Sequence, residues 1–405
     1  MVWFYQSESR RTRGGELQFI LTLPKTFLAD ILKSMQTDGS TSWLEIDLGA
    51  IKNNIRQLYA IAGVPVMAVV KANGYGHGLV ETARAAQEAG AAWCGVARIE
   101  EALTLRQNKI TLPVLVMGFT PANRVAEAVQ NQVSLCVYDL DIARAYAERA
   151  VDCHDVLRVH AKFDSGMGRL GVFPEGGLAF IQKLCDLKGL EFEGMFTHMA
   201  RADDSDRATT LWQISRFQTL VDQVQSCGLR PRLVHAANSA STLYYPAARF
   251  DIVRCGISIY GLQPSDEALN PAAIRPALTW KARLTSVKDI PEGHGIGYNY
   301  RYRTQKQERI GVVSAGYADG FRRQLRNFVL VHGKRVNVVG GVCMDQFMVQ
   351  LDDVPEAKIG DEVVLLGSQG DAVITAEETG AAWGTNNYEV VCGLANRLQR
   401  LYFEK

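Results

Sequence analysis

The feature that most constrains this chain is a repeated alternation of short apolar segments and amphipathic segments between residues 66 and 254. The apolar segments are rich in β-branched residues, as parallel strands covered on both faces of a sheet are. They predict strands at 66–70, 93–97, 113–117, 133–137, 156–162, 190–197, 231–235 and 250–254. Helical periodicity between them is clear at, for example, 79–90, 99–107, 140–150 and 206–227.

Eight strand–helix units in about two hundred residues predict an α/β fold, the (β/α)8 TIM-type barrel. A doubly wound open sheet is the alternative, but no G-x-G-x-x-G turn follows the first strand. After about residue 275 the segments become strand-like with glycine turns, and VLVHGKRVNVV predicts a hairpin around His332-Gly333-Lys334. We therefore expect a disordered or appended extension at 1–41, a barrel at 42–275 and a mainly β domain at 276–405.

Charge and cysteine usage exclude several classes of function. The net charge of the 405 residues is +1 and the basic run RRTR at 10–13 is short, so we expect no nucleic acid partner. The eight cysteines form no C-x-x-C pair and have no metal-ligand spacing, which predicts reduced thiols and no metal site. Pro24, Lys25 and Asp30 interrupt the apolar stretch after RRTR, and no segment approaches the length of a membrane span. We expect a cytoplasmic protein that does not enter a membrane.

Unusual polar residues follow the predicted strands where those strands end. Lys71 follows the first strand, Lys162 ends the fifth with Arg169 beyond it, and His198 follows the sixth. Barrel enzymes carry their active sites at the carboxyl ends of the strands, in the loops that follow them. These side chains are therefore predicted to meet at one mouth of the barrel.

The loops after the seventh and eighth strands have the features of a phosphate site. Asn238 and Ser239 open a predicted helix and offer amide N–H groups and a hydroxyl. Gly256 permits close backbone approach, so the amides of Gly256 and Ile257 are also available. The alternative is that Asn238 and Ser239 only cap a helix. A lysine, a phosphate cradle and an arginine in one barrel mouth together predict pyridoxal 5′-phosphate bound as a Schiff base.

Eight segments of the chain resemble the alanine racemases. They are AVVKANGYGHG, KFDSGMGRLGV, THMARAD, HAANSA, VRCGISIYG, GYADGF, CMDQFMV and NNYEVVCGLANRLQRLY, which occur in family order between about residues 42 and 402. The family consists of pyridoxal-phosphate isomerases with an amino-terminal barrel and a carboxy-terminal β domain. The resemblance implies interconversion of L-alanine and D-alanine by a homodimer with shared active sites. It leaves open whether the chain supplies D-alanine for peptidoglycan precursors or forms L-alanine in catabolism.

The resemblance also implies roles for individual residues. Lys71 holds the cofactor and is the base on the D face, and Tyr298 of the partner subunit is the base on the L face. Racemisation needs a base on each face, because the planar carbanion must exchange its proton on either side. Arg254 faces the pyridine nitrogen and keeps it unprotonated, since arginine does not give up its proton. His198 lies beneath the cofactor ring and contacts this arginine.

The remaining implied residues bind the cofactor phosphate or the substrate. The cofactor-binding set consists of Tyr75, Asn238, Ser239, Gly256, Ile257 and Tyr388. The substrate-side set consists of Arg169, which orients the carboxylate, Met344 and Asp345 from the partner chain, and Tyr317 at the entrance.

Lys162 is predicted to be an N-carboxylysine. It lies seven residues before Arg169, so an ordinary ammonium would place two cations close together in a partly dry site. Like charges there depress the pKa of a lysine, and a neutral amine can take up carbon dioxide. The resulting carbamate is an anion that would hold Arg169, and the family resemblance implies the same modification. The alternative is a lysine that turns to solvent.

Other activities stay open as alternatives. Gly74, Cys255 and the IGYN sequence around Tyr298 depart from the usual family pattern, so the substrate could be serine or a broader set of amino acids. A related pyridoxal-phosphate decarboxylase should carry a glutamate opposite the pyridine nitrogen, where this chain has Arg254. A non-catalytic carrier of the cofactor would need neither a β domain nor Tyr298.

Overall fold

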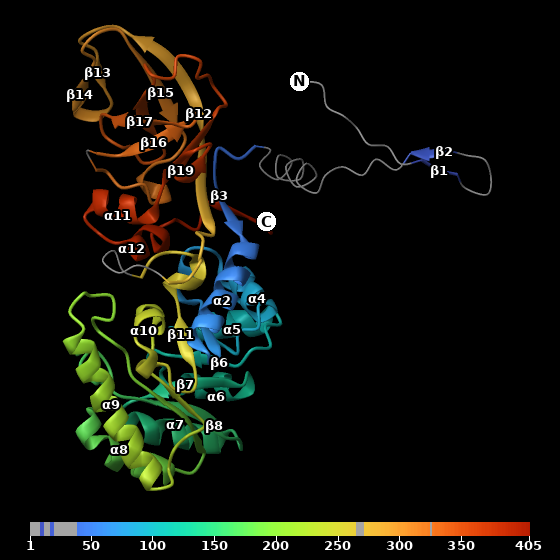
Figure 1. The fold of residues 1–405 in the computed structure, drawn as a ribbon, viewed down its shortest axis with the longest axis vertical. Helices are drawn as coiled ribbons and strands as arrows, with labels where there is room; N and C mark the ends of the chain where they lie inside the picture. Colours follow the sequence, from blue (N-terminus) through green and yellow to red (C-terminus); the bar gives the residue numbers. More distant parts are fainter. Residues whose placement is uncertain (1–8, 12–16, 20–38, 265–270, 325) are drawn as a thin grey trace.

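The computed structural model describes residues 9–11, 17–19, 39–264, 271–324 and 326–405. The described chain forms two lobes, a barrel and a β-rich domain, with the carboxyl terminus between them (Figure 1). Most of the predicted extension lies outside the described residues, apart from the antiparallel pair β1 (Ser9–Arg11) and β2 (Leu17–Phe19).

Eight parallel strands form the barrel. They are β4 (Val66–Val69), β5 (Trp93–Val96), β6 (Val114–Val116), β7 (Val133–Val137), β8 (Leu157–Lys162), β9 (Leu190–Phe196), β10 (Leu233–His235) and β11 (Val253–Cys255). Their order is β10-β9-β8-β7-β6-β5-β4-β11, and no pairing among the described residues joins β10 to β11. The barrel is therefore nearly closed, which confirms the predicted fold and its eight strands.

Helices cover the outside of the barrel between successive strands (Figure 1). The α-helices are α2 (Leu48–Ala62), α3 (Lys71–Tyr75), α4 (Leu79–Glu88), α5 (Ile99–Gln107), α6 (Val125–Gln130), α7 (Leu140–Asp152), α8 (Gly177–Cys185), α9 (Ala208–Ser226) and α10 (Ser239–Tyr244). Short 3-10 turns are η1 (Ala122–Arg124), η2 (Pro174–Gly176), η3 (Pro246–Ala248) and η4 (Ile257–Tyr260).

Helix α2 illustrates how local sequence sets these elements. Asp47 caps the helix by accepting a hydrogen bond from the Ala50 amide at 3.1 Å. Ile51, Ile55 and Leu58 recur at helical spacing and are fully or almost fully buried. Burial of each such side chain contributes about 1.5–3 kcal/mol. The helix is therefore held by its apolar face against the barrel.

The second domain is built mainly from antiparallel strands. They are β3 (Ser42–Asp47), β12 (Leu278–Ile290), β15 (Glu308–Val313), β16 (Phe328–Val331), β17 (Lys334–Val339), β18 (Phe347–Gln350), β19 (Glu362–Gln369), β20 (Ala372–Ile374) and β21 (Gln399–Phe403). A separate hairpin, β13 (Gly295–Ile296) and β14 (Tyr302–Arg303), encloses the turn η5 (Tyr298–Tyr300). The domain also contains η6 (Tyr317–Asp319), α11 (Ala376–Trp383) and α12 (Asn387–Cys392).

The sheet order explains how this domain closes. Neighbouring strands pair in the spatial order β19-β16-β17-β18-β15-β12. An additional pairing between β19 and β12 closes these six strands into a ring. The predicted hairpin is confirmed, because Val331 of β16 pairs with Lys334 of β17 across a turn with φ of 50° and 75° at its two central residues. The barrel domain expected from the sequence, 42–275, includes the residues of β3. In the structure β3 pairs with β12 and β21 and so belongs to the sheet of the second domain.

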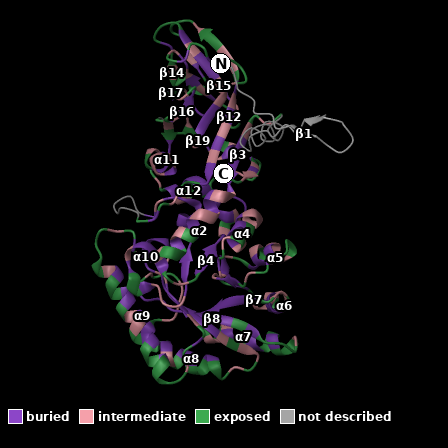
Figure 2. Cartoon of the chain, turned by 45° about the vertical axis from the view of Figure 1, so that its right-hand side comes forward, coloured by how far each residue is buried: buried purple, intermediate pink, exposed green. Residues whose placement is uncertain are grey.

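Buried residues fill the interior of both lobes (Figure 2). In the β domain, Phe321 stacks on Phe347 with ring centroids 4.4 Å apart, and Trp280 and Trp383 meet Phe321 edge-on. The segment from α12 to β21 returns toward the barrel, where Arg400 donates a 2.8 Å hydrogen bond from Nε to the carbonyl of Gly76. None of the described helices has the length and apolar character needed to cross a membrane.

Gly261, which follows the last barrel strand, packs tightly against the backbone of Arg275. Its φ is +78°, and a Cβ there would lie 1.8 Å from the carbonyl oxygen of Arg275. Gly228 also has a positive φ, +73°, but a Cβ there would meet nothing within 4 Å.

We therefore expect Gly261→Ala to destabilise the protein far more than Gly228→Ala. Both substitutions carry the left-handed backbone cost of about 1 kcal/mol. Only Gly261→Ala adds a backbone clash worth about 1–3 kcal/mol more. Urea unfolding of the two variants beside the wild type measures the difference, and equal losses in the free energy of unfolding would contradict this account.

Candidate active site

A cavity of about 470 Å³ lies at the carboxyl ends of the barrel strands. Eleven residues singled out from the sequence line it: Lys71, Tyr75, Lys162, Arg169, His198, Asn238, Ser239, Arg254, Gly256, Ile257 and Tyr388. They come from the strands β8 and β11, from the segments that follow β4, β8, β9, β10 and β11, and from α12 of the second domain. The structure thus brings together residues that are up to 317 positions apart in the chain, Lys71 and Tyr388.

Lys71 begins a tight turn of unusual backbone conformation. Ala72, Asn73 and Tyr75 have φ between 50° and 54°, a left-handed conformation that is uncommon outside glycine. Contacts from elsewhere hold the turn: the Ala72 amide donates to Glu101 Oε1 at 2.6 Å, and Arg400 binds the Gly76 carbonyl. Burial, and next the charge of Arg169, lower the pKa of Lys71. A lowered pKa favours the neutral amine, which is the nucleophilic form.

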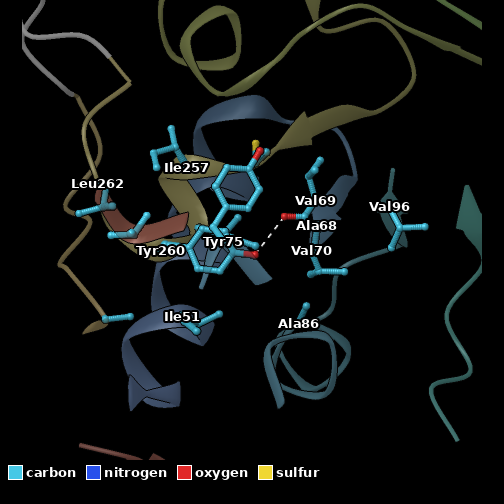
Figure 3. Close-up of a cluster of buried hydrophobic side chains, with 14 of the residues drawn as sticks. Ile51, Ala68, Val69, Val70, Tyr75, Ala86, Val96, Ile257, Tyr260 and Leu262 are labelled. Atoms are coloured by element: carbon cyan, nitrogen blue, oxygen red, sulfur yellow. Dashed lines mark hydrogen bonds between the residues drawn. The ribbon is translucent and has the colours of Figure 1, made fainter. Parts of the chain in front are cut away.

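Tyr75 and Gly256 fit closely against each other. Figure 3 shows Tyr75 beside Tyr260, whose hydroxyl donates to the Val69 carbonyl at 3.1 Å; the two rings are 5.0 Å apart. A Cβ at Gly256 would lie 2.5 Å from the Tyr75 hydroxyl oxygen, so any larger residue there would displace the Tyr75 side chain. Burial raises the pKa of Tyr75, which keeps this hydroxyl protonated and able to donate.

The loops after β10 and β11 meet at the Ser239 hydroxyl. Its oxygen accepts hydrogen bonds from the amides of Gly256, at 3.0 Å, and Ser258, at 3.4 Å. Asn238 acts as the helix cap: its Oδ1 accepts from the Ser241 amide at 3.0 Å and its Nδ2 donates to the Met199 carbonyl at 3.3 Å. The Asn238 side chain is therefore occupied by the cap, whereas the Gly256 amide and Ser239 hydroxyl together form a cradle of polar groups.

Arg254 is almost completely buried at the base of the cavity. Its guanidinium donates to the carbonyls of Thr197, at 2.7 Å, and Ala236, at 2.9 Å. It also contacts Nδ1 of His235 at 2.9 Å and Nδ1 of His198 at 3.3 Å. Burial lowers the pKa of Arg254 to about 9. A donor-only group with this many acceptors is held in one orientation.

Lys162 and Arg169 lie in the same cavity as two other cations, Lys71 and Arg254. Burial and, to a lesser extent, the charges of Arg254, Arg169 and Lys71 lower the pKa of Lys162 to about 8, against an opposing effect of Cys136. Its amine lies 4.7 Å from the centre of the Phe196 ring. In the described part of the chain, no ion pair involves any of these four cations. The cavity therefore favours an anionic ligand.

The structure does not bring four further predicted residues into this cavity. Tyr298, Tyr317, Met344 and Asp345 all belong to the β domain, and none of them lines the cavity. Tyr298 is 70% exposed and lies in η5 between β13 and β14. These two strands lie at the end of the molecule away from the barrel (Figure 1). Arg397 ties two segments of this group together by binding Asp319 at 2.6 Å and Asp345 at 2.7 Å.

Several residues at the site were not found from the sequence. Cys392 lines the cavity one helical turn after Tyr388 in α12, a spacing that could have indicated it. Phe196 lines it as the last residue of β9, but an apolar strand residue carries no signal of its own. Glu101, which holds the turn after Lys71, lies on α5, where acidic residues in the first turn are common. No group of three or more metal-binding side chains occurs among the described residues.

Comparison with known proteins gives one consistent result. The family model described as "Alanine racemase, N-terminal domain" matches residues 46–264, and that described as "Alanine racemase, C-terminal domain" matches 277–402. The alanine racemase of Symbiobacterium thermophilum is 42% identical over 372 residues, covering 91% of this chain and 99% of that protein. That of Methanococcus maripaludis is 42% identical over 368 residues, covering 89% and 98%.

Solved structures agree with the sequence comparison. The alanine racemase of Clostridium difficile 630 superposes with a TM-score of 0.86 at 37% identity, covering 90% of this chain and 96% of that one. A histidine racemase of Leuconostoc mesenteroides superposes with a TM-score of 0.83 at 29% identity, covering 90% and 99%. With matches across both lobes and nearly the full length of its relatives, this chain belongs to the alanine racemase family.

Proposed function

We propose that this chain interconverts L-alanine and D-alanine with pyridoxal 5′-phosphate as cofactor. The observation that carries the proposal is the meeting of Lys71, Arg254 and the Ser239–Gly256 cradle in one cavity of a chain in this family. The aligned relatives at 42% identity are alanine racemases. A Bacillus anthracis alanine racemase with bound L-Ala-P is 39% identical with a TM-score of 0.84.

The residues present fit this cofactor. Ser239, whose oxygen accepts from the Gly256 amide, and Tyr75, whose hydroxyl lies against Gly256, both line the cavity and offer hydroxyl donors that suit a phosphate. Four cations without ion-pair partners in the described chain offset a doubly charged anion. When bound, pyridoxal phosphate supplies an aldehyde for a lysine amine and a conjugated ring that stabilises charge developing at the α-carbon.

Lys71 and Arg254 have separate tasks in the proposed mechanism. The lowered pKa of Lys71 makes its amine available to hold the cofactor and then to exchange a proton on one face of the substrate. Arg254, anchored by carbonyls and His235, would face the ring nitrogen with a donor that it does not give up. This limits the electron demand of the ring and restricts side reactions. Arg169, which lines the same cavity, would orient the substrate carboxylate.

Tyr298 is the proposed base on the opposite face, and it comes from the partner subunit. Its distance from the cavity of its own chain and its 70% exposure support this assignment, because an exposed tyrosine on the β domain is free to enter another barrel. Tyr317, Met344 and Asp345 would reach the same partner cavity. A homodimer with twofold symmetry gives each barrel mouth the other chain's β domain.

Alanine is favoured over the alternatives by sequence distance and by one residue. The histidine racemase relative is 29% identical, well below the 42% of the alanine racemases. A decarboxylase is disfavoured because Arg254, rather than a carboxylate, lies at the base of the cavity. We also propose a cytoplasmic location, which the eight unpaired cysteines support.

The direct test is incubation of the purified protein with L-alanine and chiral analysis of the product. We expect D-alanine to accumulate until the two enantiomers are equal. Lys71→Ala should lower kcat by about three orders of magnitude or more, because the base and the cofactor link are both lost. Lys183→Ala, which changes an exposed lysine of α8, is the matched control and should retain full activity. Borohydride reduction followed by peptide mapping should label Lys71, and a label on another lysine would contradict the assignment.

We further propose that Lys162 is carboxylated and that its carbamate holds Arg169. A pKa of about 8 means that the neutral amine, the form that takes up carbon dioxide, increases as pH rises from 6 to 9. We therefore expect a carbamate signal in the ¹³C NMR spectrum with ¹³C-bicarbonate, growing over this range and absent from Lys162→Ala. Added acetate should restore part of the activity of Lys162→Ala. An unmodified Lys162 in active wild-type protein would contradict the proposal.

Subunit sharing is tested by mixing two inactive proteins, Lys71→Ala and Tyr298→Ala, after dissociation and reassociation. In a mixed dimer one site has both defects and the other has none. Random pairing makes half of the dimers mixed, so about a quarter of wild-type activity should return. Each variant taken through the same procedure alone is the control. If Tyr298 served the lysine of its own chain, every site would lack one base and the mixture would remain inactive.

A further inference from the structure

A chain of buried hydrogen bonds crosses the interior of the barrel below Arg254. Arg254 of β11 contacts His235 Nδ1 at 2.9 Å, and His235 Nε2 lies 2.9 Å from His160 Nδ1. His160 Nε2 lies 3.2 Å from Oε2 of Glu193. His160 and Glu193 come from β8 and β9, and His235 ends β10. All four side chains are at least 95% buried.

The guanidinium of Arg254 fixes which atom donates and which accepts in every hydrogen bond between Arg254 and Glu193. A guanidinium has only donors, so His235 Nδ1 must accept and the ring hydrogen of neutral His235 lies on Nε2. That hydrogen is donated to His160 Nδ1, which places the hydrogen of His160 on Nε2 and directs it at Glu193. An ionised carboxylate can only accept hydrogen bonds, so Glu193 is a suitable acceptor for the hydrogen on His160 Nε2.

The protonation states agree with this direction. Burial lowers the pKa of both His160 and His235, which keeps the two imidazoles neutral. The pKa of Glu193 falls to about 2 despite its burial, because His160, Ser134 and Arg232 all bind its carboxylate. Ser134 Oγ donates to Oε2 at 2.6 Å, and Arg232 donates to Oε1 at 2.7 Å. The chain thus joins a buried cation to a buried anion through two neutral rings.

Glu193 lies at the opposite end of the barrel from the active-site cavity. It lines a second cavity of about 330 Å³ with Pro113, Gln132, Arg158 and Arg232. Pro113, Gln132 and Arg232 each come one residue before a barrel strand begins, and Arg158 is the second residue of β8. The amino ends of parallel strands are remote from the active site in this fold. Glu193 therefore cannot touch substrate or cofactor.

We propose that Glu193 is a positioning residue for Arg254, acting across the barrel by fixing the tautomers of His160 and His235. The inference rests on the proposed function, since Arg254 matters because it faces the cofactor ring. Without an acceptor at Glu193, the hydrogen of His160 is free to move to Nδ1. His235 would then carry its hydrogen on Nδ1 and point it at a guanidinium donor. Two donors would face each other in a buried site, and Arg254 would lose its orientation.

Glu193→Gln is a sharp test because its neighbours fix how the amide would lie. Arg232 requires an acceptor, so the amide oxygen takes the place of Oε1 and the NH2 group faces His160 and the Ser134 hydroxyl, which turns from donor to acceptor. The variant therefore donates where the wild type accepts and should reverse both tautomers. Glu191→Gln is the matched control: Glu191 lies two residues earlier on β9 in the same cavity, but its partner is Arg158 at 3.5 Å.

The first measurement is ¹⁵N NMR of histidine tautomers in the holoenzyme, with His160 and His235 assigned by their loss in His160→Gln and His235→Gln. We expect both to carry hydrogen on Nε2 in the wild type and in Glu191→Gln, and on Nδ1 in Glu193→Gln. A wild-type His235 that is protonated on Nδ1 would overturn the proposal. This outcome does not depend on catalysis, so it is separate from any failure of the proposed racemase activity.

The second measurement compares kinetics and the absorbance of the bound cofactor. Loss of a hydrogen bond to a charged group corresponds to about a 10–100-fold effect. We expect Glu193→Gln to lower kcat for L-alanine within that range, to leave KM within about twofold, and to shift the absorbance maximum. Glu191→Gln should change none of these. Wild-type kinetics and absorbance in a folded Glu193→Gln would overturn the proposal.

Discussion

The rest of the site depends on four cations that lie together at the barrel mouth without carboxylate partners in the described chain; Lys162 and Arg254 are buried, Lys71 is half-buried and Arg169 is exposed. Burying charge without compensation is costly, and the fold offsets it in different ways. Arg254 is satisfied by carbonyls and a histidine, while burial shifts the pKa of Lys71 and Lys162 toward their neutral forms. What remains is a cavity prepared for anions, which suits the phosphate and the substrate carboxylate of the proposed reaction.

The two domains depend on each other through the turn after Lys71. Its left-handed residues would not hold this conformation alone, and the second domain contributes Arg400 to the carbonyl of Gly76. A Cβ at Gly76 would lie 2.1 Å from the carbonyl oxygen of Val391, so α12 packs directly on the same turn. The carboxyl-terminal segment therefore helps to set the position of the lysine, while the opposite end of the same domain carries Tyr298.

The barrel was predictable because strands buried on both faces produce continuous apolar runs, and the polar residues at their ends then fall at one mouth. The sequence could not show which sheet β3 joins, because the residue pattern of a strand indicates which side chains are buried but not which strand pairs with it. The chain from Arg254 to Glu193 was equally hidden, since its members come from four strands and each looks locally like a tolerated polar residue. The sequence left open whether Asn238 contacts a phosphate or only caps a helix. In the structure its side chain caps α10.

The central claim is that two bases exchange protons on opposite faces of the substrate, one from each chain. It is tested most directly by following the α-hydrogen of each enantiomer by mass spectrometry in deuterium oxide, before much product has formed. The account predicts that newly formed D-alanine from L-alanine carries deuterium, and likewise in the reverse direction, because the base that receives the substrate proton is not the base that delivers one. Product that retains the original protium would show that a single base serves both faces and would contradict the account.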